Sequence, residues 1–287
     1  MKSGFVAVAG RPNVGKSTLV NALTGTKVAI VSDKPHTTRH RIRGIWTQAA
    51  AQLVLVDLPG WQKPLDRLTE RMQGRVEETI AADLDAIMLV VNARERIGSG
   101  DRYVARRVFA LDIPVVIVVN QVDRLKAGHI ATQMQAAAAL GDFHALHPVS
   151  AKTGDGIDAL RSDLVSLLPE GPLLYPAEQV TDLPLDARIA ELVREQALRL
   201  TKDEVPHALT AEVVEIDERR VHVRLYTETE SQKQILIGKG GSMVREIGRG
   251  ARPHVEALLG HPVFLQLQVK TSPKWRRNET MLERLGI

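Results

Sequence analysis

The 287-residue sequence contains no cysteine, which excludes disulfide bonds, thiolate metal sites and a thiol nucleophile. It also lacks any apolar run that approaches the ~20 residues of a membrane-spanning helix. The first ten residues lead directly into a strand pattern, so we expect no secretory signal peptide. With 44% hydrophobic and 25% charged residues, the composition is that of a globular protein long enough for two domains.

Positive charge is concentrated in one part of the chain, although the net charge is only +4. Residues 231–277 contain nine Lys or Arg against two acidic residues, which gives this segment a charge of +7 and leaves −3 for the remainder. A basic segment beside a nearly neutral remainder indicates a polyanion as the partner of that segment alone.

Apolar runs alternate with helical patterns over residues 1–170. Near-continuous apolar runs are typical of strands that are buried on both faces of a parallel sheet. These runs begin at Phe5, Leu53, Ala86, Pro114 and Ala145. The alternating stretch 41–46 predicts an edge strand paired with the run that begins at Leu53. Helices are expected near residues 16–24, 66–81, 100–111, 127–141 and 156–168.

Prolines interrupt this pattern after residue 168, and we place a linker there. We expect one domain at residues 1–170, a linker at 171–183, and a second domain at 184–287 that ends in a basic tail. The second domain has the element order helix, strand, strand, helix, helix, strand, which predicts a small α+β fold.

A phosphate-binding loop is predicted at residues 10–17, which read Gly-Arg-Pro-Asn-Val-Gly-Lys-Ser between a buried strand and a helix. The glycines let backbone N–H groups point at phosphate oxygens, and the start of the helix favours the same anion. Lys16 is expected to reach the β- and γ-phosphates and Ser17 to supply its hydroxyl to Mg²⁺. Nucleotide contacts are assigned to Gly10, Arg11, Pro12, Asn13, Val14, Gly15, Lys16, Ser17 and Thr18.

A second phosphate-sensing motif ends the next strand. Asp57 is placed to hold Mg²⁺ through water, and the N–H of Gly60 to sense the γ-phosphate. The nucleotide contacts assigned to this segment are Asp57, Leu58, Pro59, Gly60 and Trp61.

Two further motifs follow the fourth and fifth buried strands and are predicted to bind the base. Asp123 can accept hydrogen bonds from N1–H and the 2-amino group of guanine, a match that adenine does not offer. Asn120 is expected to brace the loop, and the Ala151 N–H to donate to guanine O6. This arrangement predicts selection of GTP over ATP. The base-site residues are Asn120, Gln121, Val122, Asp123, Ser150, Ala151 and Lys152.

These four motifs, in this order and at strand ends, resemble those of the translation-factor-related GTPases. Residues 34–42, Lys-Pro-His-Thr-Thr-Arg-His-Arg-Ile, are similar to the Era family, bacterial GTPases that act in assembly of the small ribosomal subunit. Residues 237–241, Ile-Gly-Lys-Gly-Gly, resemble the G-x-x-G loop of a KH domain. The resemblance covers essentially the whole chain. It implies a Ras-like α/β P-loop GTPase domain with a mostly parallel six-stranded sheet, followed by a type II KH domain.

The resemblance also implies an activity and partners. They are slow, Mg²⁺-dependent hydrolysis of GTP to GDP, binding near the 3′ end of 16S ribosomal RNA, and a role in 30S subunit assembly. We expect a cytoplasmic monomer, with peripheral association at the inner face of the cell membrane left open.

Residue roles carried over from the family centre on the phosphates. One switch threonine closes onto Mg²⁺ and the γ-phosphate, and we favour Thr38 with Thr37 as the alternative. Asn13 is similar to an asparagine that helps to coordinate K⁺ in related GTPases, which adds K⁺ to the expected ions. The catalytic residues are then Lys16, Thr38, Gly60 and Asn13, and the metal ligands are Ser17, Thr38 and Asp57.

Two positions depart from GTPase patterns. Gln121 stands where the base motif usually has lysine, so affinity is expected to fall while guanine selectivity, which depends on Asp123, survives. Trp61 stands where Ras-type enzymes place a glutamine that orients the attacking water.

The RNA-binding prediction rests on the G-x-x-G turn and the cations around it. Such a turn lets a nucleic-acid strand approach the backbone closely. An aromatic residue among the cations of the tail suits base stacking. The RNA contacts are assigned to Gly238, Lys239, Gly240, Gly241, Arg245, Lys270, Lys274, Trp275, Arg276 and Arg277. A further basic cluster (Arg39, His40, Arg41 and Arg43) is explained by a charged edge strand, with ribosomal RNA contact as the alternative.

Two rival functions remain at this stage. One is an RNA chaperone in which the nucleotide only stabilises the fold, and RNA-stimulated hydrolysis would separate it from a switch. The other is an ATP-dependent P-loop kinase, against which Asp123 argues.

Overall fold

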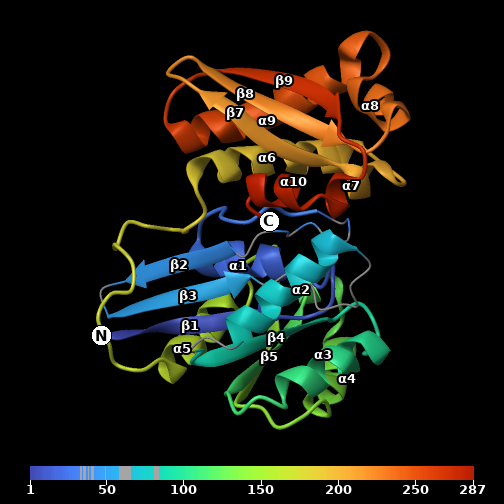
Figure 1. Cartoon of the computed structure of the whole chain (residues 1–287). Helices are drawn as coiled ribbons and strands as arrows, with labels where there is room; N and C mark the ends of the chain where they lie inside the picture. Colours follow the sequence, from blue (N-terminus) through green and yellow to red (C-terminus); the bar gives the residue numbers. More distant parts are fainter. Residues whose placement is uncertain are drawn as a thin grey trace. The chain divides into compact units, whose positions relative to one another are not determined.

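The computed structural model describes residues 1–32, 34, 37, 39, 42–48, 50–57, 66–80 and 84–287, without the side chains of residues 75–80. The chain divides into two compact units (Figure 1). The first comprises Met1–Ala29, Thr38–Lys63 and Met72–Asp182, and the second comprises Ile30–Thr37, Pro64–Arg71 and Leu183–Ile287. Among the predicted site residues, Thr38, Leu58, Pro59, Gly60 and Trp61 lie outside the described residues, as do His40 and Arg41.

The first unit contains a six-stranded sheet of order β2-β3-β1-β4-β5-β6. Only β2 runs antiparallel to its neighbour, and it pairs Trp46 with Leu53, so both the mostly parallel sheet and its edge strand are confirmed. The strands are β1 (Lys2–Ala9), β2 (Ile42–Gln48), β3 (Ala51–Asp57), β4 (Ala86–Asn92), β5 (Val115–Asn120) and β6 (Ala145–Val149).

Helices cover both faces of this sheet, which explains why its strands are almost entirely apolar (Figure 1). On one face, α1 (Lys16–Thr24) and α5 (Ile157–Leu167) bury leucines against β1, β3 and β4. On the other, α3 (Ser99–Val108) and α4 (Ala127–Ala138) pack against β4 and β5. Helix α2 spans Arg67–Ile80. The helices predicted at 100–111 and 127–141 therefore end about three residues earlier than expected.

The second unit has one three-stranded sheet of order β7-β8-β9, in which β8 and β9 are parallel. Helices α6, α8 and α9 pack on it around a core that includes Val193, Val223, Leu236 and Ile247. The order of the main elements matches the predicted KH domain. The elements are α6 (Leu185–Leu200), α7 (Val205–Ala208), β7 (Thr210–Ile216), β8 (Arg220–Thr227), α8 (Glu230–Ile237), α9 (Ser242–Leu259), β9 (Phe264–Thr271) and α10 (Glu279–Arg284).

The C-terminal segment is folded, which corrects the prediction of a basic tail with a stacking aromatic. Trp275 is fully buried, and its indole N–H donates to the carbonyl oxygen of Ala208 at 2.7 Å. It begins a short turn of 3₁₀ helix that leads into α10. A tryptophan among cations has the same sequence pattern whether it is buried in the core or exposed for base stacking. Here the hydrogen bond to Ala208 and the burial of the side chain show that it is in the core. Trp275 is therefore a core residue of this unit.

Within the described residues, no helix combines the length and the apolar character needed to cross a bilayer.

Candidate nucleotide-binding site

The loop between β1 and α1 has the conformation of a phosphate cradle. Asn13 and Gly15 both adopt positive φ angles, of 64° and 93°. A Cβ atom at Gly10 would lie 2.6 Å from the carbonyl oxygen of Val90, and one at Gly15 would lie 2.4 Å from Nδ2 of Asn120. Both glycines are therefore required by close approach as well as by backbone angle.

Lys16 is buried at the start of α1 and is held inside this loop. Its Nζ donates to the carbonyl oxygens of Gly10 at 3.1 Å and Arg11 at 3.0 Å, and the residue is only 7% exposed. Burial lowers the pKa of Lys16 to about 8, although Asp57 acts to raise it. An anion in the loop would offset the cost of holding this charge away from water, so the site favours a polyphosphate.

Ser17 and Asp57 provide the oxygen atoms that a magnesium ion requires. Ser17 Oγ donates to Oδ2 of Asp57 at 2.7 Å, and Asp57 is fully buried at the end of β3. Mg²⁺ prefers such hard oxygen ligands, and it usually binds through one or two side chains together with substrate phosphates and water. The donor set therefore fits Mg²⁺ at this position.

Asn120, the last residue of β5, ties three loops together. Its Nδ2 donates to the carbonyl oxygen of Val14 at 3.0 Å, and its Oδ1 accepts from the backbone N–H of Gln121 at 2.8 Å. The same Oδ1 accepts from the Ala151 N–H at 3.1 Å. The sequence assigned that N–H to guanine O6, whereas here it helps to hold the two base-binding motifs at a fixed spacing from the phosphate loop.

Asp123 lies where it can recognise a purine edge. Its Oδ1 accepts from Ser150 Oγ at 3.1 Å, which orients the carboxylate. Its Oδ2 is 3.9 Å from the guanidinium of Arg124, which is 71% exposed, so this contact is weak. The side chain of Asp123 is 17% exposed. A carboxylate fixed on one side and open on the other suits a bidentate contact with guanine.

Gln121 takes the place of the usual lysine and still reaches the phosphate loop. It has a left-handed backbone, with φ 71°, and its Nε2 donates to the carbonyl oxygen of Asn13 at 3.4 Å. The side chain of Gln121 thus lies against the phosphate loop.

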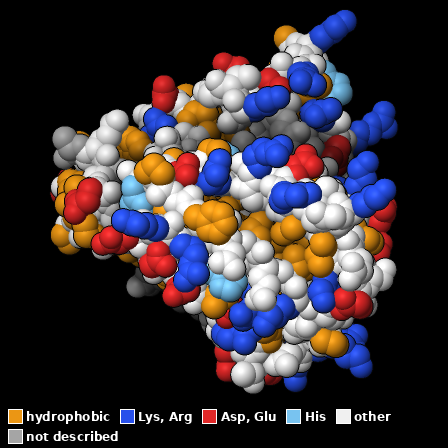
Figure 2. Space-filling model, turned by 90° about the horizontal axis from the view of Figure 1, so that it is seen from above, with side chains coloured by type: hydrophobic (Ala, Val, Ile, Leu, Met, Phe, Trp, Pro, Cys, Tyr) orange, Lys and Arg blue, Asp and Glu red, His pale blue; other side chains and the backbone are white. Residues whose placement is uncertain are grey.

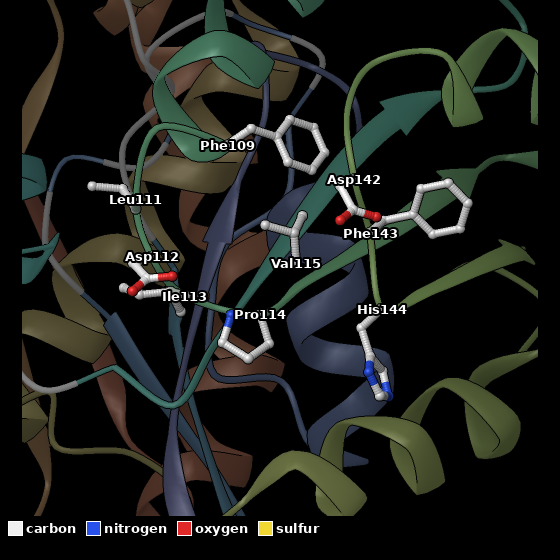
Figure 3. A pocket seen from close by; sticks show the side chains of 9 residues that line it. All are labelled: Phe109, Leu111, Asp112, Ile113, Pro114, Val115, Asp142, Phe143 and His144. Carbon is white, nitrogen blue, oxygen red and sulfur yellow. The ribbon is translucent and has the colours of Figure 1, made fainter.

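One cavity in the first unit lies at the opposite end of the parallel strands. It has a volume of about 480 Å³ and adjoins Val115, where β5 begins, whereas Asn120 and the phosphate loop lie at the strand ends. Its acidic residues and His144 are well separated in Figure 3. Open parallel sheets bind ligands at the carboxyl ends of their strands, so this cavity is not the nucleotide site. No cluster of three or more metal-ligating side chains occurs in the described parts of the chain.

The G-x-x-G loop follows α8 and has the backbone that a nucleic-acid strand needs for close approach. Gly238, Gly240 and Gly241 have φ angles of 73°, 58° and 78°. A Cβ at Gly238 would lie 2.8 Å from the backbone nitrogen of Met243. Lys239 is exposed at the tip, and Arg245 donates to the Gly240 carbonyl at 2.8 Å, which stiffens the turn.

The remaining predicted RNA contacts differ in their accessibility. Lys270, Lys274 and Arg277 are exposed. Arg276 is instead paired with Asp66 at 2.7 Å, and the two side chains are 19% and 12% exposed. In Figure 2, Lys and Arg side chains are spread over the face seen from above, with fewer acidic ones among them. The exposed cations suit contact with a polyanion, and Arg276 has a structural partner.

Sequence reasoning missed a set of buried charges on α6. Arg194 is 1% exposed and donates to both carboxylate oxygens of Glu191, at 2.8 and 2.7 Å. It also donates to the backbone carbonyl of Thr37. Glu195 is fully buried and accepts from the Val31 N–H at 2.9 Å. These charged residues lie on the side of α6 away from Ile189, Val193 and Ala197, which is the pattern of a solvent-exposed face, and their partners lie far away in sequence. These contacts hold the backbone at Val31 and at Thr37, the residue before Thr38 in the sequence.

Comparisons with known proteins match both units of the chain. Residues 5–121 match the family described as 50S ribosome-binding GTPase, and residues 202–276 match the KH domain. The protein called GTPase Era from Mycobacterium sp. strain KMS is 43% identical, with 100% of this chain and 99% of the relative covered. The proteins of that name from strains JLS and MCS show the same identity and coverage.

Two crystal structures have similar folds over the whole chain. One is a variant of Aquifex aeolicus Era bound to GDP and aluminium fluoride, and the other is Era in complex with MgGDPNP and nucleotides 1506–1542 of 16S ribosomal RNA. Each has a TM-score of 0.95 and 35% identity, and each comparison covers 100% of this chain and 99% of the other. With a phosphate cradle, a guanine-type base loop and a KH domain in one chain, the protein belongs to the Era family of GTPases.

Proposed function

We propose that this GTPase is a switch protein that binds 16S ribosomal RNA near its 3′ end through the KH domain and acts in 30S subunit assembly. The observation that carries the proposal is Asn120, which holds the phosphate loop and the guanine loop together in a chain that also has a G-x-x-G turn. The Era structure with MgGDPNP and 16S ribosomal RNA supports this pairing of functions. We place the protein in the cytoplasm as a monomer.

Hydrolysis requires positioning and charge stabilisation more than covalent chemistry. A water attacks the γ-phosphorus in line, the bond from γ-phosphorus to the bridging oxygen breaks, and GDP and phosphate leave. Lys16 and the backbone N–H groups of the loop stabilise the charge that develops on the phosphate oxygens. Ser17, Asp57 and Thr38 would hold Mg²⁺, which neutralises charge between the β- and γ-phosphates when bound.

Coupling between nucleotide and RNA is part of the proposal. The contacts of Arg194 and Glu195 join Thr37 and Val31 to helix α6 of the KH-containing unit. Closure of Thr38 onto Mg²⁺ and the γ-phosphate would pull on this segment, and GTP hydrolysis would release it. In this way GTP favours an arrangement competent for RNA, and hydrolysis triggers RNA release.

The proposed function is tested by a double substitution in the G-x-x-G loop, Lys239→Asp with Gly240→Asp. A Cβ at Gly240 meets nothing within 4 Å, and aspartate tolerates its left-handed backbone, so the fold is retained. We expect at least a tenfold loss of affinity for a single-stranded RNA with the 3′-terminal sequence, from charge repulsion against its phosphates. Fluorescence anisotropy measures the binding, and GTP hydrolysis without RNA should not change.

A matched control makes the same charge change elsewhere in the KH-containing unit. Arg219→Asp with Gly260→Asp also alters an exposed cation and a left-handed glycine with open space around it. This control should bind RNA as the wild type does. Equal RNA affinity in the loop variant and the wild type would refute the KH assignment. If RNA binds but does not accelerate GTP hydrolysis, the chaperone with a structural nucleotide is the better description.

We also propose that K⁺ bound near Asn13 accelerates hydrolysis. The left-handed backbone of Asn13 in the phosphate loop supports this, since a cation there would neutralise transition-state charge. Turnover in KCl should exceed turnover in NaCl several-fold. Asn13→Gly keeps the positive φ and removes the side chain, so it should make the two rates equal. Equal wild-type rates in the two salts would exclude the role of K⁺.

A further inference from the structure

The first unit carries an arginine-rich surface that neither the nucleotide site nor the KH domain uses. It consists of Arg94, Arg96, Arg102, Arg106 and Arg107, all exposed, on α3 and the loop before it. We call this set the arginine surface. We propose that it is a second RNA-binding surface, which contacts ribosomal RNA phosphates independently of the G-x-x-G loop. The inference rests on the proposed function and extends it to the GTPase unit.

The positive charge of this surface is not neutralised by its own segment. The two acidic residues there, Glu95 and Asp101, are both engaged by Arg11 of the phosphate loop, at 2.9 and 2.7 Å. Among the residues that the structure describes, Arg94, Arg96, Arg102 and Arg106 form no ion pair. Net positive charge therefore faces solvent across one side of α3 and its preceding loop.

Two arginines of this surface also repel each other in the absence of a partner. Arg102 and Arg106 are separated by one helical turn, and like charges at that spacing destabilise a helix. Such a cost is consistent with a partner that neutralises the charges when it binds.

The chemistry of the surface fits RNA better than a membrane. All five cations are arginine, whose planar guanidinium binds phosphate in a bidentate manner and stacks on rings. Arg107 already lies over the ring of Tyr103 at 5.0 Å, and Tyr103 is 37% exposed. A helix that lies on a membrane turns its apolar face to lipid. The apolar face of α3, with Val104, Ala105 and Val108, is instead buried in the core.

A groove beside the arginine surface offers room for part of an RNA strand. It lies between α3 and α4 and has a volume of about 560 Å³. Arg96, Arg102 and His129 line it together with uncharged side chains, and no acidic residue contributes to it. Two arginines, one on α3 and one in the loop before it, therefore line one hollow beside α4, and an RNA backbone could follow it.

The test removes three of these charges, with Arg96→Gln, Arg102→Gln and Arg106→Gln in the full-length protein. Glutamine has nearly the helix propensity of arginine, so α3 is preserved. Binding to purified small ribosomal subunits and to the short 3′-terminal RNA is measured over a KCl series. The matched control neutralises Lys27, Lys202 and Arg219, exposed cations outside the surface.

We expect the triple variant to bind small subunits at least tenfold more weakly at physiological salt, with unchanged affinity for the short RNA. The slope of log affinity against log salt should fall by about 2–3, as expected for three lost phosphate contacts. The control should keep the slope of the wild type, and GTP hydrolysis without RNA should be unchanged in both variants.

Other outcomes separate this inference from the proposed function. A triple variant that bound small subunits with the affinity and the salt slope of the wild type would overturn the inference. The inference would also fail if the triple variant lost binding to anionic phospholipid vesicles but kept its affinity for subunits. If the wild type failed to bind the short RNA, the KH assignment would be wrong. The proposal for the arginine surface would still be tested by comparing the affinities of the triple variant and of the control for small subunits.

Discussion

Replacing Asp123 with asparagine is expected to change the nucleotide preference from GTP to xanthosine triphosphate. The asparagine amide presents a donor to the 2-amino group of guanine, so one hydrogen bond is replaced by a repulsive contact. The 2-oxo group of xanthine accepts from the same amide. At ~1–3 kcal/mol for this one mismatched buried hydrogen bond, the loss of GTP affinity is roughly 5–150-fold. Competition binding with the two triphosphates measures the change.

Asp155→Asn provides the control for this prediction. Asp155 is an exposed carboxylate in the neighbouring loop and accepts from Thr153 Oγ1 at 2.6 Å. Its substitution should leave the preference for GTP unchanged. An Asp123→Asn protein that still preferred GTP would show that the base is recognised elsewhere.

Replacing Lys16 with glutamine is expected to lower the rate of GTP hydrolysis by about 10²–10³-fold, the usual effect of losing one preorganised donor to transition-state charge. The apo protein should unfold at a temperature no lower than that of the wild type, because the substitution removes a charge that is buried in the loop. Single-turnover hydrolysis and thermal unfolding with and without GDP measure the two effects. A variant that hydrolysed GTP at the wild-type rate would exclude Lys16 from the phosphate site.

The lowered pKa of Lys16 also gives a pH dependence. Its folded-state pKa is about 8, whereas an unfolded lysine titrates near 10.4, so the apo fold gains stability as pH rises from about 8 to about 10.4. Phosphates should raise this pKa again, so nucleotide binding takes up a proton above pH 8. Affinity for GDP should then fall by up to about tenfold per pH unit above 8. Titrations between about pH 7 and 9, below the deprotonation of guanine, detect this slope, which Lys16→Gln should abolish.

The sequence predicted well those features that depend on short spacing. The phosphate loop, the base loops and the G-x-x-G turn each consist of a few adjacent residues whose backbone is set by glycine and by a strand end. Their places along the chain also predicted the parallel sheet and the KH topology, both of which are confirmed.

Features that depend on distant partners were not predicted. Trp275 is buried because Ala208, 67 residues away, accepts its indole N–H. Glu195 and Arg194 contact Val31 and the carbonyl of Thr37, more than 150 residues earlier. Nothing in the local pattern of a charged helix or an aromatic among cations reveals whether its partner is solvent, RNA or another part of the chain.

Removing the charged side chains of Glu191, Arg194 and Glu195 on α6 from water costs free energy. Two carboxylates and a guanidinium away from water stabilise a fold only when their partners are well placed. Two of these partners are backbone groups: the N–H of Val31 donates to Glu195, and the carbonyl oxygen of Thr37 accepts from Arg194. These charges therefore depend for part of their hydrogen bonding on the backbone at Val31 and Thr37, and the proposed coupling between nucleotide and RNA rests on this dependence.

The most direct test of the account is equilibrium binding of GTP, GDP and ATP to the purified full-length protein, with Mg²⁺ and with a chelator. The buried Lys16 in its glycine-dependent loop, the Ser17–Asp57 pair and the oriented carboxylate of Asp123 predict tight, magnesium-dependent binding of GTP, with ATP at least about 10²-fold weaker. Binding of ATP as strong as that of GTP, or no magnesium-dependent binding of any guanine nucleotide, would contradict the account.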